Sequence, residues 1–339
     1  MSTQLSSPAR RTALAAGVLL LLTSIAWSAS ADPLRIIGGR RATQAETYAT
    51  VVIGDEIDGL FEPTCTGTLV APDLVVTATH CVVDIDEETD EVLGVLDAGT
   101  MLVGVNILDA YNDDGDFYEV DELIPNMRFP NPDDEPIDET GLGEEDDIAL
   151  IWLTEDVVGV EPVPILPSAA VSEALAPGSP IIITGYGLTE ADNDDSAGVL
   201  HIAEVFVDGL GPWEFSVEGG GEVDSCQGDS GGPGYVEWDG DIYLVGASSR
   251  GVENSDRSCG DGGIYTLVPA FQTWMAQMTD GEFDPADTGA GDGPAAGAGG
   301  GGSDGGCSAS GLRPSAAGAK WLLGAMALLL VGVGLRGRR

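Results

Sequence analysis

A serine set among glycines is the first feature of this 339-residue sequence that suggests chemistry. Residues 226–233 read Cys-Gln-Gly-Asp-Ser-Gly-Gly-Pro, with Ser230 in the middle. A serine hydroxyl is a poor nucleophile unless a neighbouring base takes its proton. The oxyanion that develops needs backbone N–H donors, and glycines beside the serine let the chain bend so that such donors converge. The segment therefore predicts a nucleophile next to an oxyanion hole.

Two further segments supply what this serine would need. Histidine is scarce, with only His80 and His201 in the chain, so there are few candidates for a proton carrier at neutral pH. His80 lies in 77–81, Thr-Ala-Thr-His-Cys, and Asp147 precedes an apolar run, where it could be partly buried and orient an imidazole. Each motif alone is also typical of a turn, a core histidine or the start of a strand. Together, in this order, they indicate nucleophilic catalysis.

The elements that must position these residues are mainly strands. Between residue 36 and about 283, short runs rich in Val, Ile, Thr and Leu alternate with Gly, Asp and Pro, which predicts an all-β barrel or sandwich. Roughly 250 residues leave room for two small barrels. The predicted strands include 68–70, 74–77, 148–153, 181–184 and 243–247. One helix is predicted near the end of the domain from an apolar stripe at helical spacing: Val268, Phe271, Trp274, Met275 and Met278.

Four motifs in this order give the chain a family resemblance. Residues 36–39 (Ile-Ile-Gly-Gly), 79–81 (Thr-His-Cys), 147–150 (Asp-Ile-Ala-Leu) and 228–233 make the region 36–280 resemble the chymotrypsin/trypsin family of serine proteases. The resemblance implies two six-stranded antiparallel β-barrels with a C-terminal helix, and an active site in the cleft between them.

The same resemblance assigns roles to single residues. It implies that His80 is the general base, Asp147 its orienting partner and Ser230 the nucleophile. The N–H groups of Gly228 and Ser230 would form the oxyanion hole. His80 and Asp147 would belong to the first barrel and Ser230 to the second.

The cysteines are compatible with an oxidising compartment. Four of the five lie in the predicted domain, and spacing alone does not choose among their three possible pairings. The family resemblance implies the pairs Cys65–Cys81 and Cys226–Cys259. A closed loop of about 15 residues contributes roughly 3 kcal/mol in the chain-entropy model, so the first bridge should matter for stability.

Substrate preference is predicted from Asp224, six residues before Ser230. The resemblance implies that Asp224 lies at the base of the primary specificity pocket and favours a substrate Arg or Lys, since an unpaired buried carboxylate is costly. Gly251 and Gly263 match pocket-wall positions that leave room for a long side chain. Ser249 and Gly251 would offer backbone groups to an extended substrate.

Arg250 departs from the family pattern, which commonly has Trp at this position. Its side chain could point to solvent, favour acidic residues upstream of the scissile bond, or fold back towards Asp224 and weaken the preference for basic substrates. The insertion 252–258 also makes this wall of the pocket longer than usual.

Activation is predicted at the Arg35–Ile36 bond, because the family matures by cleavage at such a bond. The new ammonium group of Ile36 would fold inward and pair with Asp229, which would order the oxyanion loop. An α-amino group has a pKa of about 7.7–8.0 in model peptides, so alkaline deprotonation should switch activity off. The predicted propeptide, 32–35, is very short.

Both ends of the chain differ from the middle. Residues 1–31 have a basic start, a short apolar core and a small-residue exit, which indicate a secretory signal peptide; a permanent anchor is the alternative. A flexible linker is predicted at 284–306. The segment 307–339 contains Cys307, an apolar stretch at 316–335 and terminal arginines, and it resembles the MYXO-CTERM type of bacterial sorting signal. A simple transmembrane anchor is the alternative.

The charge distribution narrows the range of partners. The segment 36–306 holds five basic and 56 acidic side chains, and hence a formal charge of −51. Such a field repels nucleic acid and anionic membranes and attracts cationic ligands, although solvated acidic loops explain the composition equally well. We expect protein or peptide substrates, an activating protease, a sorting peptidase and membrane contact only through the tail. The exported domain is expected to be a monomer at the cell surface or outside the cell.

Three acidic stretches, 84–91, 109–122 and 133–147, interrupt the predicted strands and are interpreted as surface insertions. The part 111–116 has a calcium-like composition, but it lacks the alternating carboxylates and placed glycine of an EF-hand loop. Nothing in the motifs requires a metal or cofactor. The sequence thus predicts a serine endopeptidase. An inactive binding module of the same fold and a cation-binding structural surface protein are the alternatives.

Overall fold

The computed structural model describes residues 36–283, except 58, 87–88, 90, 113–114, 131–140, 192, 194–195, 219–222 and 254–258. The predicted signal peptide, propeptide, linker and sorting signal therefore lie outside the described residues, together with Arg35 and Cys307. None of the described helices is long and apolar enough to cross a membrane.

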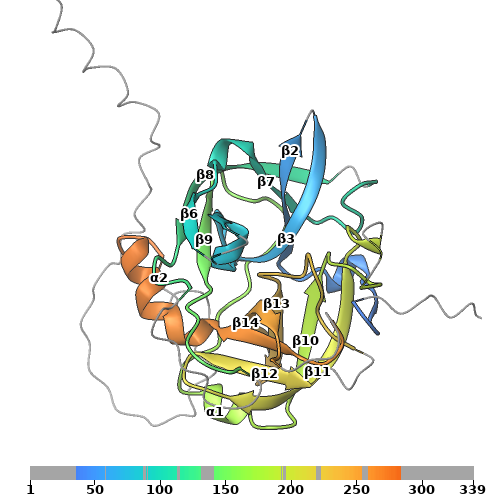
Figure 1. The fold of residues 1–339 in the computed structure, drawn as a ribbon, viewed down its shortest axis with the longest axis vertical. Helices are drawn as coiled ribbons and strands as arrows, with labels where there is room; N and C mark the ends of the chain where they lie inside the picture. The colour runs from blue at the N-terminus through green and yellow to red at the C-terminus, as the bar shows by residue number, and fades with distance from the viewer. Residues whose placement is uncertain are drawn as a thin grey trace, which may run out of the picture. The chain divides into compact units, whose positions relative to one another are not determined.

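The first half of the described chain forms a closed antiparallel barrel, the upper one in Figure 1. Its strand order is β2-β3-β4-β9-β8-β7. Apolar residues alternate inward along these strands, as at Val51, Ile53 and Val103, and fill the barrel. The bounds are β2 Thr50–Ile57, β3 Leu60–Ala71, β4 Leu74–Thr77, β7 Met101–Val105, β8 Asp116–Pro125 and β9 Ala149–Leu153.

The second half forms the lower barrel of Figure 1. Six strands follow the order β11-β10-β13-β14-β15-β12, and the pairing of β11 with β12 closes the ring. The short strand β1, Arg40–Arg41, adds to the outer edge of β11. The bounds are β10 Pro180–Gly185, β11 His201–Leu210, β12 Glu214–Glu218, β13 Pro233–Trp238, β14 Asp241–Gly251 and β15 Gly263–Leu267. The expected pair of six-stranded barrels is confirmed.

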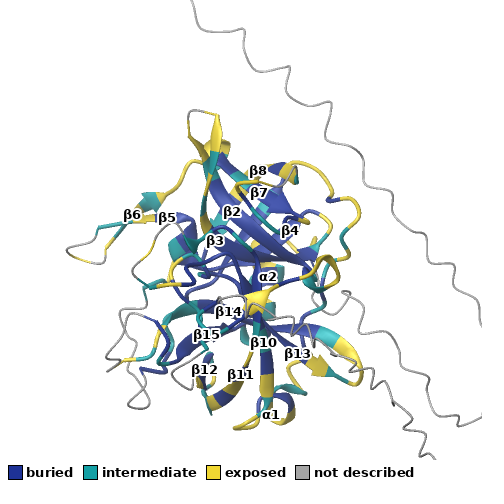
Figure 2. Cartoon of the chain, turned by 90° about the vertical axis from the view of Figure 1, so that its right-hand side faces the viewer, coloured by how far each residue is buried: buried dark blue, intermediate teal, exposed yellow. Residues whose placement is uncertain are grey.

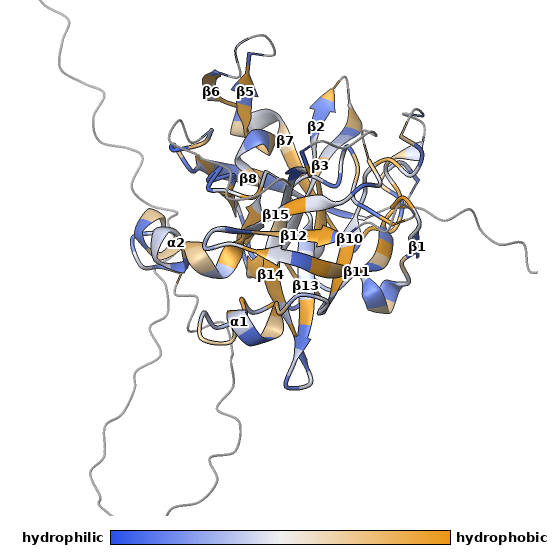
Figure 3. Cartoon of the chain, turned by 60° about the horizontal axis from the view of Figure 1, so that its bottom comes forward, coloured by the Kyte–Doolittle hydropathy of each residue, from blue (hydrophilic) through white to orange (hydrophobic). Residues whose placement is uncertain are grey.

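Hydrogen bonds between buried side chains join the two barrels. The Thr50 hydroxyl in β2 lies 2.6 Å from the Thr184 hydroxyl in β10 and 3.0 Å from that of Tyr235 in β13. Buried residues gather in the strands of both barrels, while the exposed ones lie mainly at hairpin ends (Figure 2). Hydropathy follows the same pattern, with a hydrophilic turn between β13 and β14 (Figure 3). The two barrels are thus packed together, with His80 and Asp147 on the first barrel and Ser230 on the second.

The elements outside the barrels are short. They are β5 Val83–Ile85, β6 Val92–Val95, α1 Val171–Ala174, α2 Gln272–Met278 and the 3-10 turns η1 Gln44–Glu46, η2 Thr79–Cys81, η3 Ala98–Thr100 and η5 Val268–Phe271. The predicted C-terminal helix is confirmed as α2, preceded by η5. Its apolar stripe packs as expected except at Met278, which is 45% exposed.

One interpretation of the acidic stretches is wrong. Residues 116–122 are not a surface insertion but most of β8, a strand of the first barrel. Tyr118 and Val120 are buried, while Glu119 between them and the other acidic residues of the strand are exposed. Apolar and acidic residues alternate along this part of the sequence, as in a half-buried strand, but the number of acidic residues favoured the interpretation as a surface insertion. Residues 84–91 partly form the turn of the β5–β6 hairpin.

Candidate active site

His80 is held at the rim of the first barrel by η2, directly after β4. The disulfide between Cys81 and Cys65 fastens this turn to β3. The Thr79 hydroxyl donates to the carbonyl of Ile148 at 2.7 Å, which fixes the turn against the start of β9. The imidazole is half-buried, and its Nδ1 lies 2.7 Å from Oδ2 of Asp147.

Asp147 is buried where the chain enters β9. The backbone turns sharply at the preceding Asp146, whose φ is 60°, a value that few non-glycine residues adopt. Oδ1 of Asp147 accepts the backbone N–H of His80 at 3.1 Å, and Oδ2 accepts the Ser249 hydroxyl at 2.7 Å. This carboxylate is therefore fixed by both barrels, because Ser249 belongs to β14.

The two partners shift each other's protonation. Burial lowers the pKa of His80, but the charge and hydrogen bond of Asp147 outweigh burial and raise it above 6.5. Burial raises the pKa of Asp147, but His80 and Ser249 outweigh it and hold the pKa below 3.8. The ionised carboxylate thus stabilises an imidazolium and keeps a neutral imidazole with its proton on Nδ1, so that Nε2 is free to act as a base.

Ser230 lies at a sharp bend that depends on glycine. Gly228 has φ 93°, and a Cβ there would lie 2.9 Å from Cα of Gly187. Gly231 has φ 73°, and a Cβ there would lie 2.6 Å from the carbonyl oxygen of Thr66. Thr66 also donates its backbone N–H to the carbonyl of Ser230 at 2.9 Å. Because Thr66 follows Cys65 on β3, the serine bend and the histidine turn are anchored to the same strand.

The N–H groups beside the serine are available to a ligand. Within the described part of the chain, the N–H groups of Gly228 and Ser230 donate to no protein acceptor. No hydrogen bond among the described residues joins His80 to the Ser230 hydroxyl; such bonds are often long in unliganded sites and tighten with substrate. The arrangement contains a hydroxyl, a base oriented by Asp147 and two N–H groups with no acceptor among the described residues, which are the parts that acyl transfer requires.

A cavity of about 190 Å³ is lined by both Ser230 and Asp224. Ser249, Arg250 and Gly251 also line it, whereas Gly263 is not among its lining residues. A Cβ at Gly263 would nevertheless come within 3.4 Å of the Asp224 carboxylate. A second disulfide, Cys226–Cys259, joins two edges of this cavity. The structure therefore brings the predicted specificity residues together beside the predicted nucleophile.

Asp224 is only 2% exposed and is held by backbone donors. The N–H groups of Ser225, Gly260 and Gly262 donate to its carboxylate at 2.8, 2.9 and 3.0 Å. Burial raises the pKa of Asp224 despite these hydrogen bonds. No basic side chain among the described residues pairs with it.

Arg250 does not fold back towards Asp224, so that alternative is wrong. Its guanidinium forms a two-pronged ion pair with Glu214, with nitrogen–oxygen distances of 2.6 and 2.9 Å. Sequence reasoning missed Glu214, because no motif marks it and it lies 36 residues from its partner. Its strand reads Glu-Phe-Ser-Val-Glu, and nothing in that pattern distinguishes the buried Glu214 from the exposed Glu218. Most of the insertion 252–258 lies outside the described residues.

The predicted activation residues lie in the second barrel. The side chain of Ile36 is already buried in its core in the uncleaved chain. Asp229 is also buried, and it accepts the N–H groups of Cys226 and Gly187 at 2.9 and 2.8 Å. Burial raises the pKa of Asp229 to about 7. This carboxylate has backbone donors but no cationic partner among the described residues.

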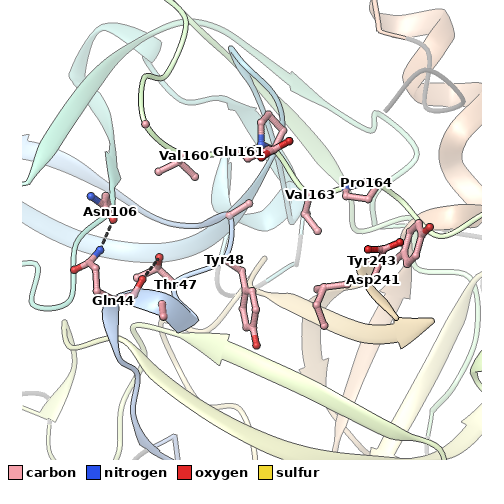
Figure 4. Close-up of a pocket in the computed structure, with 15 residues that line it drawn as sticks. Gln44, Thr47, Tyr48, Asn106, Val160, Glu161, Val163, Pro164, Asp241 and Tyr243 are labelled. Atoms are coloured by element: carbon pink, nitrogen blue, oxygen red, sulfur yellow. Dashed lines mark hydrogen bonds between the residues drawn. The ribbon is translucent and has the colours of Figure 1, made fainter. Parts of the chain in front are cut away.

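A second cavity and a group of possible metal ligands are the other candidate sites, and neither has the residues for catalysis or metal binding. A larger cavity, about 770 Å³, lies among residues 44–49, 159–164 and 241–243 (Figure 4). It shares no lining residue with the cavity at Ser230 and contains neither serine nor histidine. Among the described residues, the one group with metal-ligand spacing is Cys65, His80 and Cys81, but its two sulfurs are joined in a disulfide.

Comparisons with known proteins agree with this geometry. The family model described as Trypsin matches residues 36–275. A vitellin-degrading protease of Bombyx mori is 26% identical over 276 residues, which cover 76% of this chain and 92% of that protein. The proclotting enzyme of Tachypleus tridentatus is 30% identical over 271 residues, covering 72% and 66%. Melanization protease 1 of Drosophila melanogaster is 26% identical over 267 residues, covering 71% and 64%.

The chain spans about two thirds of the length of the last two relatives and nearly all of the first. The matched region coincides with the two barrels and contains the His80–Asp147 pair and the Ser230 bend. With this fold, this cleft and this family match, the chain belongs to the trypsin family.

Proposed function

We propose that this chain is a serine endopeptidase that cleaves peptide bonds through an acyl-enzyme on Ser230. The Ser230 oxygen attacks the scissile carbonyl carbon while His80 Nε2 takes the hydroxyl proton. The N–H groups of Gly228 and Ser230 stabilise the oxyanion. His80 then gives the proton to the leaving amine, and water releases the acyl group by the same steps. The observation that carries this proposal is the 2.7 Å contact between His80 Nδ1 and buried Asp147.

Labelling with a fluorophosphonate probe tests the proposal. Only a serine activated by a base and an oxyanion hole reacts rapidly with such a probe. We expect labelling of the wild type, its loss in Ser230→Ala, and its retention in Ser168→Ala, a serine that lies outside the cavity at Ser230 and donates its hydroxyl to the carbonyl of Pro269. A wild type with an Ile36 end that remains unlabelled would instead support the inactive binding module.

We further propose that cleavage follows Arg or Lys. The support is a buried carboxylate, Asp224, that lines the same cavity as Ser230. A substrate guanidinium or ammonium would supply the charge that Asp224 lacks, so binding a basic side chain recovers part of the desolvation cost. Profiling on a peptide library should show Arg and Lys dominating at the position before the cut. An enrichment of large apolar residues there would contradict the assignment.

Activation by cleavage of Arg35–Ile36 is proposed on separate grounds. The support is the pKa of Asp229, about 7 in the uncleaved chain, which indicates a buried carboxyl short of positive charge. A new Ile36 ammonium would provide that charge. N-terminal sequencing of active enzyme should find Ile36 first, whereas activity in a chain that still carries Arg35 would contradict the proposal. An external protease or a second copy of the enzyme would make the cut.

Export and surface attachment complete the proposal. The support is the sequence pattern of residues 1–31, typical of a signal peptide, and that of residues 307–339, which resembles a sorting signal. A sorting peptidase would cut near Cys307. The mature enzyme would then act as a monomer at the cell surface or beyond it. Mass spectrometry of the mature C-terminus should find it close to Cys307. An intact terminus at Arg339 would indicate a plain anchor instead.

A further inference from the structure

A buried ion pair lies beside the cavity at Ser230. Arg250 on β14 donates from Nη1 and Nη2 to the two carboxylate oxygens of Glu214 on β12, at 2.6 and 2.9 Å. The Glu214 side chain is 1% exposed and that of Arg250 is 28% exposed. Paired, planar contacts of this kind fix the two groups in orientation as well as distance. The charge of Arg250 is thus already matched before any substrate arrives.

Both members of the pair also hold the backbone of one segment from the first barrel. The N–H of Gly143 donates to Oε2 of Glu214 at 2.7 Å. Nη2 of Arg250 donates to the carbonyl of Gly141 at 2.8 Å. Residues 141–147 form no helix or strand, so side-chain contacts of this kind must set their path.

Asp147, at the end of this segment, is bound by the neighbours of the same pair. Ser249, which donates its hydroxyl to Oδ2 of Asp147, precedes Arg250 in β14. Thr266, whose hydroxyl donates to the carbonyl of Asp147 at 2.8 Å, is the cross-strand partner of Glu214. One patch of the second barrel therefore holds the segment at 141–143 and again at Asp147.

We propose that Arg250 and Glu214 are positioning residues that clamp the segment 141–147 and so keep Asp147 aligned with His80. This rests on the proposed serine-protease function and extends it to a residue where the chain departs from its family. Without the clamp, the segment keeps its attachment at Asp147 and the ion pairs of Arg128 with Glu144 and Asp146, but it loses the bond that holds Gly141 and the fixed orientation of the carboxylate that holds Gly143. The carboxylate then samples positions farther from the imidazole.

The consequence is measurable in the pH dependence. Asp147 is the charged group that raises the pKa of His80, and the nearby Cys65 and Cys81 do not titrate because they form a disulfide. A looser contact lowers the pKa of His80 towards its ordinary value. The acidic limb of reactivity, which follows deprotonation of His80, would therefore move to lower pH. A general loss of folded protein would reduce the amplitude of that limb without moving it.

The test uses the rate of fluorophosphonate labelling across pH, normalised to the number of reactive sites. This probe reports the base and the serine without depending on the Asp224 pocket. We expect Arg250→Met to slow labelling by about 10²-fold, as small misalignments do, and to move the acidic limb downward. Arg250→Lys keeps the charge but loses the fork, and it should recover part of both effects. Arg40→Met removes a solvent-exposed ion pair with Glu46 far from the site and serves as the matched control.

A second variant protects the test against failure to fold. Arg250→Met with Glu214→Gln leaves no unpaired buried charge, keeps an acceptor for Gly143 and still loses the bond to Gly141. It should show the same downward shift. Slower labelling with an unmoved limb in either variant, or an unchanged rate, overturns the clamp. All variants are compared as the cleaved enzyme, and a wild type with an Ile36 end that does not label overturns the proposed function instead.

Discussion

The buried carboxylates of the first and second barrels differ in the groups that compensate their negative charge. In the first, the negative charge of Asp147 is matched within the chain by His80 and Ser249, and its pKa is lowered. In the second, Glu214 is paired with Arg250, but Asp224 and Asp229 receive only backbone N–H donors from the described residues, and burial raises their pKa. Burying an ionised group is costly unless a partner compensates it. The difference teaches that the carboxylate beside His80 is compensated by groups already present in the chain, while the two carboxylates on the Ser230 side, Asp224 and Asp229, are placed to receive positive charge from outside it.

The largest effect is expected where the charge is matched internally. Asp147→Asn would allow the neutral imidazole to adopt the wrong tautomer, because an amide can donate where the carboxylate only accepts. We expect kcat to fall by about 10⁴-fold with little change in KM. Steady-state kinetics on a peptide ester would measure this. A fall in kcat of less than tenfold would mean that Asp147 has no role in the reaction and that its compensated charge does not serve catalysis.

Asp224→Ala should have the next largest effect, and a selective one. Removing one partner of a buried charge pair costs several kcal/mol, so kcat/KM for Arg and Lys substrates should fall by about 10³-fold. Substrates with a small apolar residue at that position should be unaffected. Asp241→Ala, an exposed carboxylate lining the larger cavity, is the control. Equal losses on all substrates would show that Asp224 supports the fold rather than receiving a cation.

Asp229→Asn should lower kcat of the cleaved enzyme by about 10²-fold, because the loop that carries the oxyanion donors would lose its anchor. The uncleaved chain offers a second measurement. Its Asp229 pKa is raised from 3.8 to about 7, so this group's contribution to stability is complete below 3.8 and is lost as pH rises to about 7.

Denaturant titrations of uncleaved Ser230→Ala, with and without Asp229→Asn, would isolate this contribution. The difference in unfolding free energy between the two should change across that pH window. A constant difference would mean that the pKa of Asp229 is the same in the folded and unfolded chain, and a change of the opposite sign would mean that Asp229 already has a cationic partner before cleavage.

The smallest expected effect is a shift in the pH midpoint at which His80 loses its proton. Because the pKa of His80 is raised above 6.5, the acidic limb of kcat/KM should have its midpoint above 6.5 in the wild type. In Asp147→Asn the midpoint should lie lower, since the stabilising charge is gone. A wild-type midpoint at or below 6.5 would indicate that burial, not Asp147, dominates at His80.

Much of the fold could be predicted from periodicity and turn residues. Strands such as β4 and β10 are apolar runs bounded by Gly, Pro or Asp, and the stripe from Val268 predicted α2. The strand β8 could not be recognised as easily, because its outward positions are acidic and charge outweighed alternation in the interpretation. A strand can therefore be predicted from its own residues when its outer face has few charges, but the prediction becomes ambiguous when that face is strongly acidic.

The sequence alone determined which residues are chemically able to act: a serine among glycines, one histidine beside a cysteine, and an aspartate before an apolar strand. It also limited the cysteine pairings without choosing among them. Only the tertiary structure decided that Arg250 meets Glu214 rather than Asp224, and that Ser249 and Thr266 hold Asp147 from the other barrel. The reason is that these contacts join strands far apart along the chain, and their geometry depends on how two closed barrels pack, which no local pattern encodes.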